Sequence, residues 1–334
     1  MLKLKYLYEN YELAKLILTN WEYDEEELDK MLSYFRISSN AIYPFYSSYQ
    51  DKKVCFLRIA PEEEKIESNL YGEMEFIEYL LEHNYPALKP VPSKTGDKIL
   101  KLKTKCGIYY ASVYEGVKGN RLDRCELNEE IMYSYGRALG KMHYLSSKFV
   151  PKVKKWNHVD VMDFIGDELL NYPDTKELLQ ELDEIRNGLS TLTISNENYG
   201  LVHYDFDLDN VFYEEDKKQC NVIDFDDGMY HFFTLDIELS LDSLANEMDE
   251  KKFIDAKMKF LKGYEAEYPL PENYEERLPL MRRFANLYSY ARILRATSEQ
   301  LVDEPDWMME LRETLNDTLH EIKDGLNQNR INMK

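Results

Sequence analysis

The chain has 334 residues, of which 44% are hydrophobic, and it carries a formal net charge of −21 at pH 7. This length and composition predict a folded chain of two lobes or domains and exclude wholesale disorder. A chain this acidic repels the phosphate backbone of nucleic acids and the surface of anionic membranes, so neither is an expected partner, whereas a cationic small molecule is compatible with it.

The cysteines and the N-terminal segment indicate the compartment. Cys55, Cys106, Cys125 and Cys220 form no C-x-x-C pair, and their spacing suits neither a zinc site nor a small disulfide framework. The first 20 residues lack the apolar core of a signal peptide, and no run of about 18 apolar residues occurs that would span a membrane. We therefore expect a cytoplasmic protein, either a monomer or a homodimer.

The first third of the chain is predicted to be rich in strands. Leu70, Met74 and Ile77 recur at helical spacing and indicate a strong helix. Several short apolar runs are flanked by turn residues on both sides, and this pattern predicts strands. The expected elements are a helix at residues 11–21, strands at 42–46 and 54–59, a helix at 67–82, and strands at 99–102 and 108–114.

The pattern becomes mainly helical after Gly116 and Gly119. A long helix is expected at residues 126–145, and the short strands that interrupt the helical remainder are expected at 201–202, 211–213 and 222–225. The fold class is therefore α+β. We expect an N-terminal lobe with an antiparallel sheet at residues 1–115 and a mainly helical C-terminal lobe at residues 116–334, with a short connection near residues 114–120.

The stretch from His203 to Asp227 carries the clearest chemical signal. Phosphoryl transfer needs a carboxylate that orients the attacking hydroxyl and accepts its proton, and oxygen ligands that hold Mg²⁺ on the nucleotide phosphates. Asp205 can be that base, Asn210 can offer an amide oxygen to the metal, and Asp224 can supply a metal-binding carboxylate.

The spacing H-x-D-x-x-x-x-N followed by I-D-F-D resembles the aminoglycoside phosphotransferase and choline kinase-like family of small-molecule kinases. The run from Tyr135 to His143 is similar to that family's L-G-x-x-L-x-x-L-H helix, and Leu57-Arg58-Ile59 resembles its strand that carries a phosphate-binding cation. The resemblance implies a bilobal protein-kinase-like fold, ATP or GTP as the phosphate donor, and Mg²⁺ as the cofactor.

The resemblance also implies where the nucleotide binds. Arg58 would neutralise phosphate charge, held by either Glu73 or Glu75, of which the family spacing favours Glu73. The remaining residues expected at the nucleotide are Ser39 and Asn40, in a polar turn that covers the phosphates, and Val113 and Glu115, at the connection that contacts the base.

Several further residues of the motif region are expected to support the catalytic loop. His203 resembles a residue that braces the loop, and Asp236 is expected to accept hydrogen bonds from loop amides. Asp226 and Asp227 remain open between a second metal contact and a helix cap. Tyr204 stands where the family usually has glycine, which tolerates backbone conformations that tyrosine does not.

The acceptor is not specified by these motifs. An aminoglycoside-like antibiotic, an amino alcohol and a sugar all remain candidates. Two other classes are also open. One is a Ser/Thr protein kinase of similar fold, although no D-F-G occurs and no A-P-E follows the stretch from His203 to Asp227. The other is a nucleotide-binding module without catalysis, although Asp205, Asn210 and Asp224 are all present.

Overall fold

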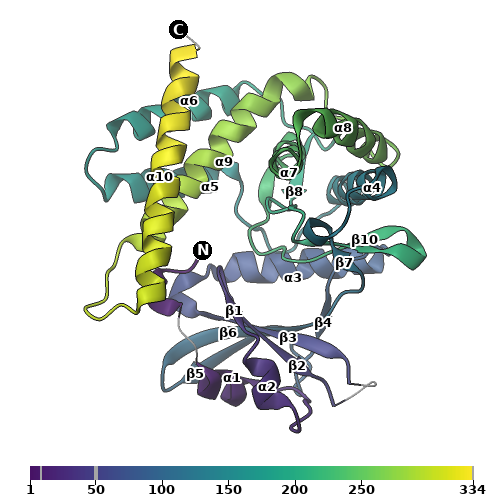
Figure 1. The fold of residues 1–334 in the computed structure, drawn as a ribbon, viewed down its shortest axis with the longest axis vertical. Helices are drawn as coiled ribbons and strands as arrows, with labels where there is room; N and C mark the ends of the chain where they lie inside the picture. The colour runs from purple at the N-terminus through teal and green to yellow at the C-terminus, as the bar shows by residue number, and fades with distance from the viewer. Residues whose placement is uncertain (8–9, 49–51, 333–334) are drawn as a thin grey trace. The chain divides into compact units, whose positions relative to one another are not determined.

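The computed structural model describes residues 1–7, 10–48 and 52–332 (Figure 1). The chain forms two compact units. The larger unit comprises Glu9–Lys155 and Asn196–Glu272, and the smaller one comprises Met1–Tyr8, Trp156–Ser195 and Asn273–Lys334. Within the described ranges, no helix is long and apolar enough to cross a bilayer.

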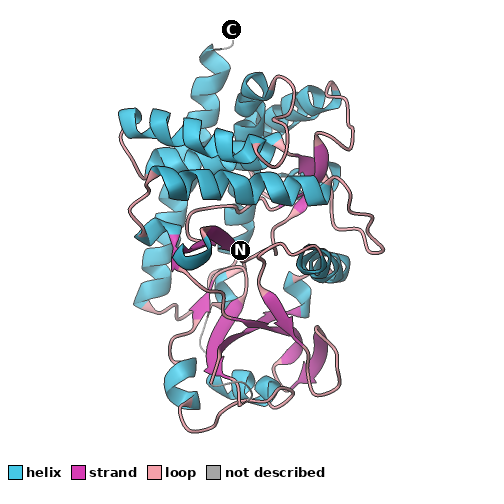
Figure 2. Ribbon diagram, turned by 90° about the vertical axis from the view of Figure 1, so that its right-hand side faces the viewer, coloured by secondary structure: helices cyan, strands magenta, loops and turns pink. Residues whose placement is uncertain are grey.

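An antiparallel sheet of six strands lies in the first part of the larger unit, and Figure 2 shows its strands in magenta. The strands run in the order β1-β2-β3-β6-β4, and β5 also pairs with β6. The fold class predicted from the sequence is thereby confirmed. The strands are β1 (Arg36–Ile37), β2 (Ala41–Tyr46), β3 (Val54–Pro61), β4 (Lys89–Val91), β5 (Leu100–Thr104) and β6 (Gly107–Glu115).

One face of this sheet packs against α1 (Tyr11–Leu18) and α2 (Leu28–Leu32). Side chains alternate between the two faces of a strand, so Leu57 and Val113, which are paired across β3 and β6, both enter this apolar core. The neighbouring pair, Arg58 and Ser112, therefore belongs to the opposite face. Figure 1 shows α3 (Glu67–Glu82) running along the sheet on the side away from α1 and α2.

The rest of the larger unit is a set of helices with two small sheets. Helices α4 and α8 pack closely, because a Cβ atom at Gly136 would lie 1.8 Å from the carbonyl oxygen of Phe260. Strand β9 pairs with β10 and β7, and β8 pairs with β11. The elements are β7 (Asn120–Arg121), η3 (Leu122–Arg124), α4 (Glu129–Ser146), β8 (Tyr199–Val202), β9 (Val211–Glu214), η4 (Glu215–Lys217), β10 (Gln219–Val222), β11 (Met229–Phe232), α7 (Thr234–Asn246) and α8 (Glu250–Glu265).

The smaller unit is helical. Asn157 and Asp160 form a reciprocal capping box at the start of its helix α5. A buried ion pair joins α9 to α6, with Arg283 Nε 2.6 Å from Glu181 Oε1. The predicted division at residues 115 and 116 differs from these two units and stays a prediction. The helices of the smaller unit are α5 (His158–Leu170), α6 (Lys176–Ser190), α9 (Tyr274–Thr297) and α10 (Asp306–Asn332).

Candidate active site

Two loops of the larger unit bring the motif residues together. Residues 203–210 connect β8 to β9, and residues 223–228 connect β10 to β11. Since β9 pairs with β10 and β8 pairs with β11, both ends of the two loops are held side by side. The backbone N–H of Ile223 donates to the carbonyl oxygen of Asn210 at 3.0 Å, which extends the β9–β10 pairing into the loops.

Asn210 contacts Asp205 directly. Its amide nitrogen donates to the Asp205 carboxylate at 2.8 Å and to the Asp205 carbonyl oxygen at 3.1 Å. These bonds use the NH₂ end of the side chain and leave its amide oxygen as the end that can bind a cation. The loop thus presents a carboxylate and an amide oxygen together, five residues apart in the sequence.

Asp224 lies in a strongly acidic environment. Burial, followed by the negative charges of Asp226, Asp205 and Asp227, raises its pKa to about 7. Asp207, in the neighbouring loop, also has a pKa raised to about 7, first by burial and then by the charges of Asp205 and Asp209. Carboxylates crowded in this way favour a bound cation, which would offset their mutual repulsion.

The donor set fits Mg²⁺. Among the described residues, no three His, Cys, Asp or Glu side chains are grouped so as to hold a metal ion by themselves. Mg²⁺ at phosphoryl-transfer sites needs only one or two protein carboxylates, because nucleotide phosphates and waters supply the other oxygens. Asp224 and Asn210 are the oxygen donors that the two loops offer.

Asp236, in the first turn of α7, holds the start of the loop formed by residues 203–210. Its carboxylate accepts from the backbone N–H groups of His203 at 2.7 Å and Tyr204 at 2.8 Å. It also bonds Nε2 of His143 at 3.1 Å. Burial lowers the pKa of both His143 and His203, which keeps these rings neutral. Nε2 of His203 lies 2.9 Å from the carbonyl oxygen of Ile223, so this ring bridges the two loops.

The backbone at Tyr204 and at Asp224 is left-handed, with φ of 70° and 64°. This conformation is costly for residues with a Cβ atom, whereas the glycine that the family resemblance leads us to expect at the position of Tyr204 would adopt it without that cost. The two bonds to Asp236 hold the loop in this shape. A residue with unfavourable backbone angles held firmly in place is typical of functional loops.

Arg58, on β3, is buried and paired with Glu73 of α3. Two parallel hydrogen bonds, from Nη1 to Oε1 at 2.7 Å and from Nη2 to Oε2 at 2.9 Å, join the guanidinium and the carboxylate. Nε also donates to the Ser112 hydroxyl, and Nη2 donates to the Tyr114 hydroxyl. Burial alone would lower the pKa of Arg58, but the Glu73 charge raises it above its ordinary value. Glu75 faces elsewhere and accepts from backbone amides of residues 152 and 153.

Asn40, in the turn between β1 and β2, reaches the second loop. Its amide nitrogen donates to Asp226 at 3.0 Å, and Asn40 and Arg58 line the same small cavity. Ser39 beside it is half-buried. Lys65 also pairs with Asp226, with Nζ 2.6 Å from Oδ2. Although burial raises the pKa of Asp226, the charges of Lys65 and Arg58 hold it well below its ordinary range.

Val113 and Glu115 do not join this group. Val113 is fully buried and lies between β3 and β4, on the face toward α1 and α2. The carboxylate of Glu115 pairs with Lys53 at 2.8 Å and with Lys89 at 3.0 Å. The expected contact of these two residues with the nucleotide base stays a prediction.

Sequence reasoning missed three residues that contact this region. Lys65 bonds Asp226, Tyr114 bonds Arg58, and Lys155 donates to the carbonyl oxygens of Phe225 and Asp226. Tyr114 could have been found, because it lies two residues from Ser112 on the same face of β6. Lys65 and Lys155 belong to no local pattern that points to partners so distant in the sequence.

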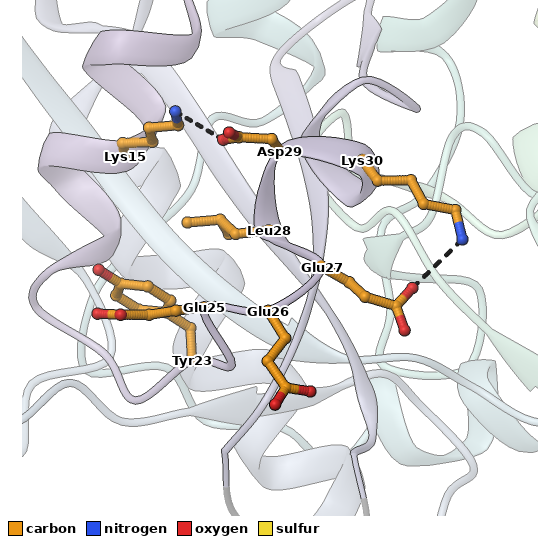
Figure 3. A pocket seen from close by; sticks show the side chains of 8 residues that line it. All are labelled: Lys15, Tyr23, Glu25, Glu26, Glu27, Leu28, Asp29 and Lys30. Carbon is orange, nitrogen blue, oxygen red and sulfur yellow. Dashed lines mark hydrogen bonds and ion pairs between the residues drawn. The ribbon is translucent and has the colours of Figure 1, made fainter.

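A surface hollow elsewhere in the larger unit contains none of the predicted site residues. Figure 3 shows the acidic segment at its rim, with Lys15 paired to Asp29 and Lys30 paired to Glu27. These ion pairs are exposed and contribute little to stability. The residues that line the hollow are Lys15, Tyr23, Glu25, Glu26, Glu27, Leu28, Asp29 and Lys30.

Two curated relatives resemble the chain in sequence. Amicoumacin kinase from Bacillus subtilis is 27% identical over 259 residues, which cover 73% of this chain and 75% of that enzyme. Homoserine kinase from Caulobacter vibrioides is 24% identical over 215 residues, which cover 64% of this chain and 66% of that enzyme.

Solved structures share the fold. An amicoumacin kinase in complex with AMP-PNP, Ca²⁺ and Ami superposes with a TM-score of 0.77 and 22% identity, over 95% of this chain and 94% of that one. A microcompartment-associated aminopropanol kinase gives a TM-score of 0.69 at 17% identity, over 96% and 98% of the two chains. A spectinomycin phosphotransferase in complex with ADP and spectinomycin gives a TM-score of 0.59 at 13% identity, over 94% of each chain. The predicted kinase-like fold is therefore confirmed.

Residues 38–279 match the family described as the phosphotransferase enzyme family. The matched range is more than half of the chain and includes strands β2 to β6, helix α3 and both loops of the candidate site. The resemblance predicted from the motifs is confirmed: this chain belongs to the phosphotransferase enzyme family.

Proposed function

We propose that the protein transfers the γ-phosphate of ATP to a hydroxyl group of a small molecule that also carries an ammonium group. The observation that carries this proposal is the arrangement of Asp205, Asn210 and Asp224 on two loops held together by paired strands. Family membership supports the reaction class, and the geometry supports the roles of these residues.

Asp205 acts as the base. The acceptor hydroxyl gives its proton to the Asp205 carboxylate as its oxygen forms a bond to the γ-phosphorus. The bond between that phosphorus and the bridging oxygen breaks, and ADP leaves with the electron pair. The bond from Asn210 to Asp205 at 2.8 Å fixes the direction of the carboxylate, which is what positioning of a general base requires.

Asp224 and Asn210 would hold Mg²⁺. When bound, this ion neutralises the charge of the nucleotide phosphates and offsets the repulsion among the loop carboxylates. Arg58 contributes positive charge from the sheet, although Glu73, Ser112 and Tyr114 already occupy most of its N–H groups.

The acceptor class follows from charge. Burial and the neighbouring Asp205, Asp209 and Asp242 raise the pKa of Asp207, beside the base. An ammonium group placed near these carboxylates would relieve their repulsion, whereas a neutral sugar would not. The relatives include an aminopropanol kinase and a homoserine kinase, whose names are compatible with an amino alcohol or an aminated antibiotic as the acceptor.

The test measures ADP release from Mg-ATP against pooled aminated antibiotics, amino alcohols and neutral sugars. We expect release with an aminated pool, and a loss of kcat of at least about 100-fold in Asp205→Ala, the range for removal of a general base. Asp216→Ala, at an exposed carboxylate of η4, is the matched control and should keep full activity. Equal activity of Asp205→Ala and wild type would refute the mechanism, and turnover with the sugar pool alone would refute the acceptor class.

A further inference from the structure

Lys155 has a buried ammonium group that the reaction described above does not use. Lys155 is only 4% exposed, and its Nζ donates to the carbonyl oxygens of Phe225 and Asp226, each at 3.0 Å. Both carbonyls belong to the loop that carries Asp224. Burial lowers the pKa of Lys155, against the opposing charges of Glu73 and Asp226.

The segment that carries Lys155 is fastened across helix α3. We call residues 152–155 the strap. The Glu75 carboxylate accepts from the backbone N–H of Lys152 at 2.9 Å and of Val153 at 2.9 Å. Gly72 lets the strap approach the helix, because a Cβ atom there would lie 2.7 Å from Cγ of Lys155 and 3.1 Å from the Val153 carbonyl oxygen.

The ammonium group of Lys155 contacts the loop of residues 223–228, which the side chain of Phe225 also anchors. The ring of Phe225 packs edge-on against Phe76 of α3, with centroids 6.2 Å apart, and lies tilted against the ring of His203, with centroids 4.7 Å apart. Its carbonyl, and the next one, turn toward Lys155. The loop is thus held at its side chain by α3 and at its peptide groups by the strap.

An apolar side chain of similar length would fill the same space without the cost of burying a charge. It would not hold two carbonyl groups in one direction. The backbone at Asp224, one residue before Phe225, has the unfavourable φ of 64°. Peptide groups held firmly on its C-terminal side oppose its relaxation to an ordinary conformation.

We infer that Lys155 is a positioning residue that, through the strap, holds the Asp224 loop in the geometry that binds the metal–nucleotide complex. This inference rests on the proposed function, since it assigns to Asp224 a role in metal binding. Glu73, which pairs with Arg58, follows Gly72 directly on α3. The same helix therefore positions both the guanidinium of Arg58 and the strap.

The test compares the affinity for AMP-PNP with saturating Mg²⁺ and with EDTA, measured by calorimetry in the full chain. In wild type, Mg²⁺ should tighten binding. In Lys155→Met, we expect the ratio of the two affinities to fall by about 10-fold or more, in the range for residues that orient metal ligands, while affinity in EDTA stays near wild type. Lys154→Met, at the exposed neighbour, is the matched control and should change neither.

A second variant keeps the test valid if Lys155→Met does not fold. Gly72→Ala retains the ammonium group but pushes the strap away from α3, and it should lower the same affinity ratio. If the ratio is unchanged in the folded variants, or if binding weakens equally with and without Mg²⁺, Lys155 supports the fold only and the inference is overturned. If wild type itself shows no effect of Mg²⁺, the proposed function fails first, and the two failures are therefore distinguishable.

Discussion

Two charged regions of the larger unit are built in opposite ways. Around Arg58, the positive and negative charges are matched, because the guanidinium makes two parallel hydrogen bonds to the Glu73 carboxylate and a further one to the Tyr114 hydroxyl. Around Asp224, carboxylates gather, and burial followed by the charges of Asp226 and Asp205 raises the pKa of Asp224. The first arrangement stabilises the folded chain, whereas the second costs stability and favours a bound cation. The two regions therefore differ in whether the chain itself supplies the compensating charge.

The largest effect on stability is expected at the matched pair. Glu73→Gln should lower the free energy of unfolding by about 3–5 kcal/mol, because it leaves the buried Arg58 charge without its counter-ion. Urea unfolding at pH 7 measures this loss. Glu75→Gln, on the same helix but half-buried, should lose only about 1 kcal/mol. If the two variants lost equal stability, the Arg58 pair would not be the stabilising contact that its geometry indicates.

The opposite sign is expected at the crowded loop. Asp224→Asn should raise the free energy of unfolding in EDTA by about 1–2 kcal/mol, because one of the mutually repelling carboxylates becomes neutral. Asparagine also tolerates the left-handed backbone at this position. The same variant should lose the Mg²⁺-dependent part of AMP-PNP binding. A metal-free variant less stable than wild type would contradict the contrast between the two regions.

A pH titration sharpens the comparison at Asp207. Its pKa is raised from 3.8 to about 7 in the folded chain, so the folded state binds this proton more tightly than the unfolded state does. The resulting stabilisation is present below about pH 4 and is lost as the pH rises through 7.

Asp207→Asn removes this dependence. The free energy of unfolding of the variant, relative to wild type, should therefore increase by about 1–2 kcal/mol between pH 5 and pH 8. Asp216→Asn, at an exposed site, is the control and should stay within about 0.5 kcal/mol of wild type at both values. A difference that does not vary with pH would argue against the raised pKa.

The smallest effect concerns the backbone of the catalytic loop. Tyr204→Gly should be more stable than Tyr204→Ala by about 1 kcal/mol, because only alanine pays the cost of a left-handed φ with a Cβ atom. At most positions glycine is the less stable of the two by about 0.5–1 kcal/mol, so the reversed order is diagnostic. Thermal unfolding of the two variants gives the comparison, and the ordinary order would show that the loop relaxes.

The sequence predicted the fold class and the residues of the two loops because each depends on local patterns. Apolar spacing marked α3, and the run from Asp205 to Asn210 is short enough for its spacing to indicate a shared loop. The choice between Glu73 and Glu75 needed the structure, since both lie near the buried face of one helix. Lys155 escaped prediction because its partners follow it by some 70 residues and are backbone carbonyls, which have no sequence signature.

The division into units also lay beyond prediction, because it depends on contacts between distant parts of the chain. The larger unit needs both Glu9–Lys155 and Asn196–Glu272. During synthesis at about 5–20 residues per second, the ribosome takes roughly 6–23 s to pass from residue 155 to residue 272. During that time the sheet and helix α3 have been synthesised, but Asn196–Glu272, which complete their unit, have not. We therefore expect the larger unit to complete its folding only after residue 272 has emerged from the ribosome.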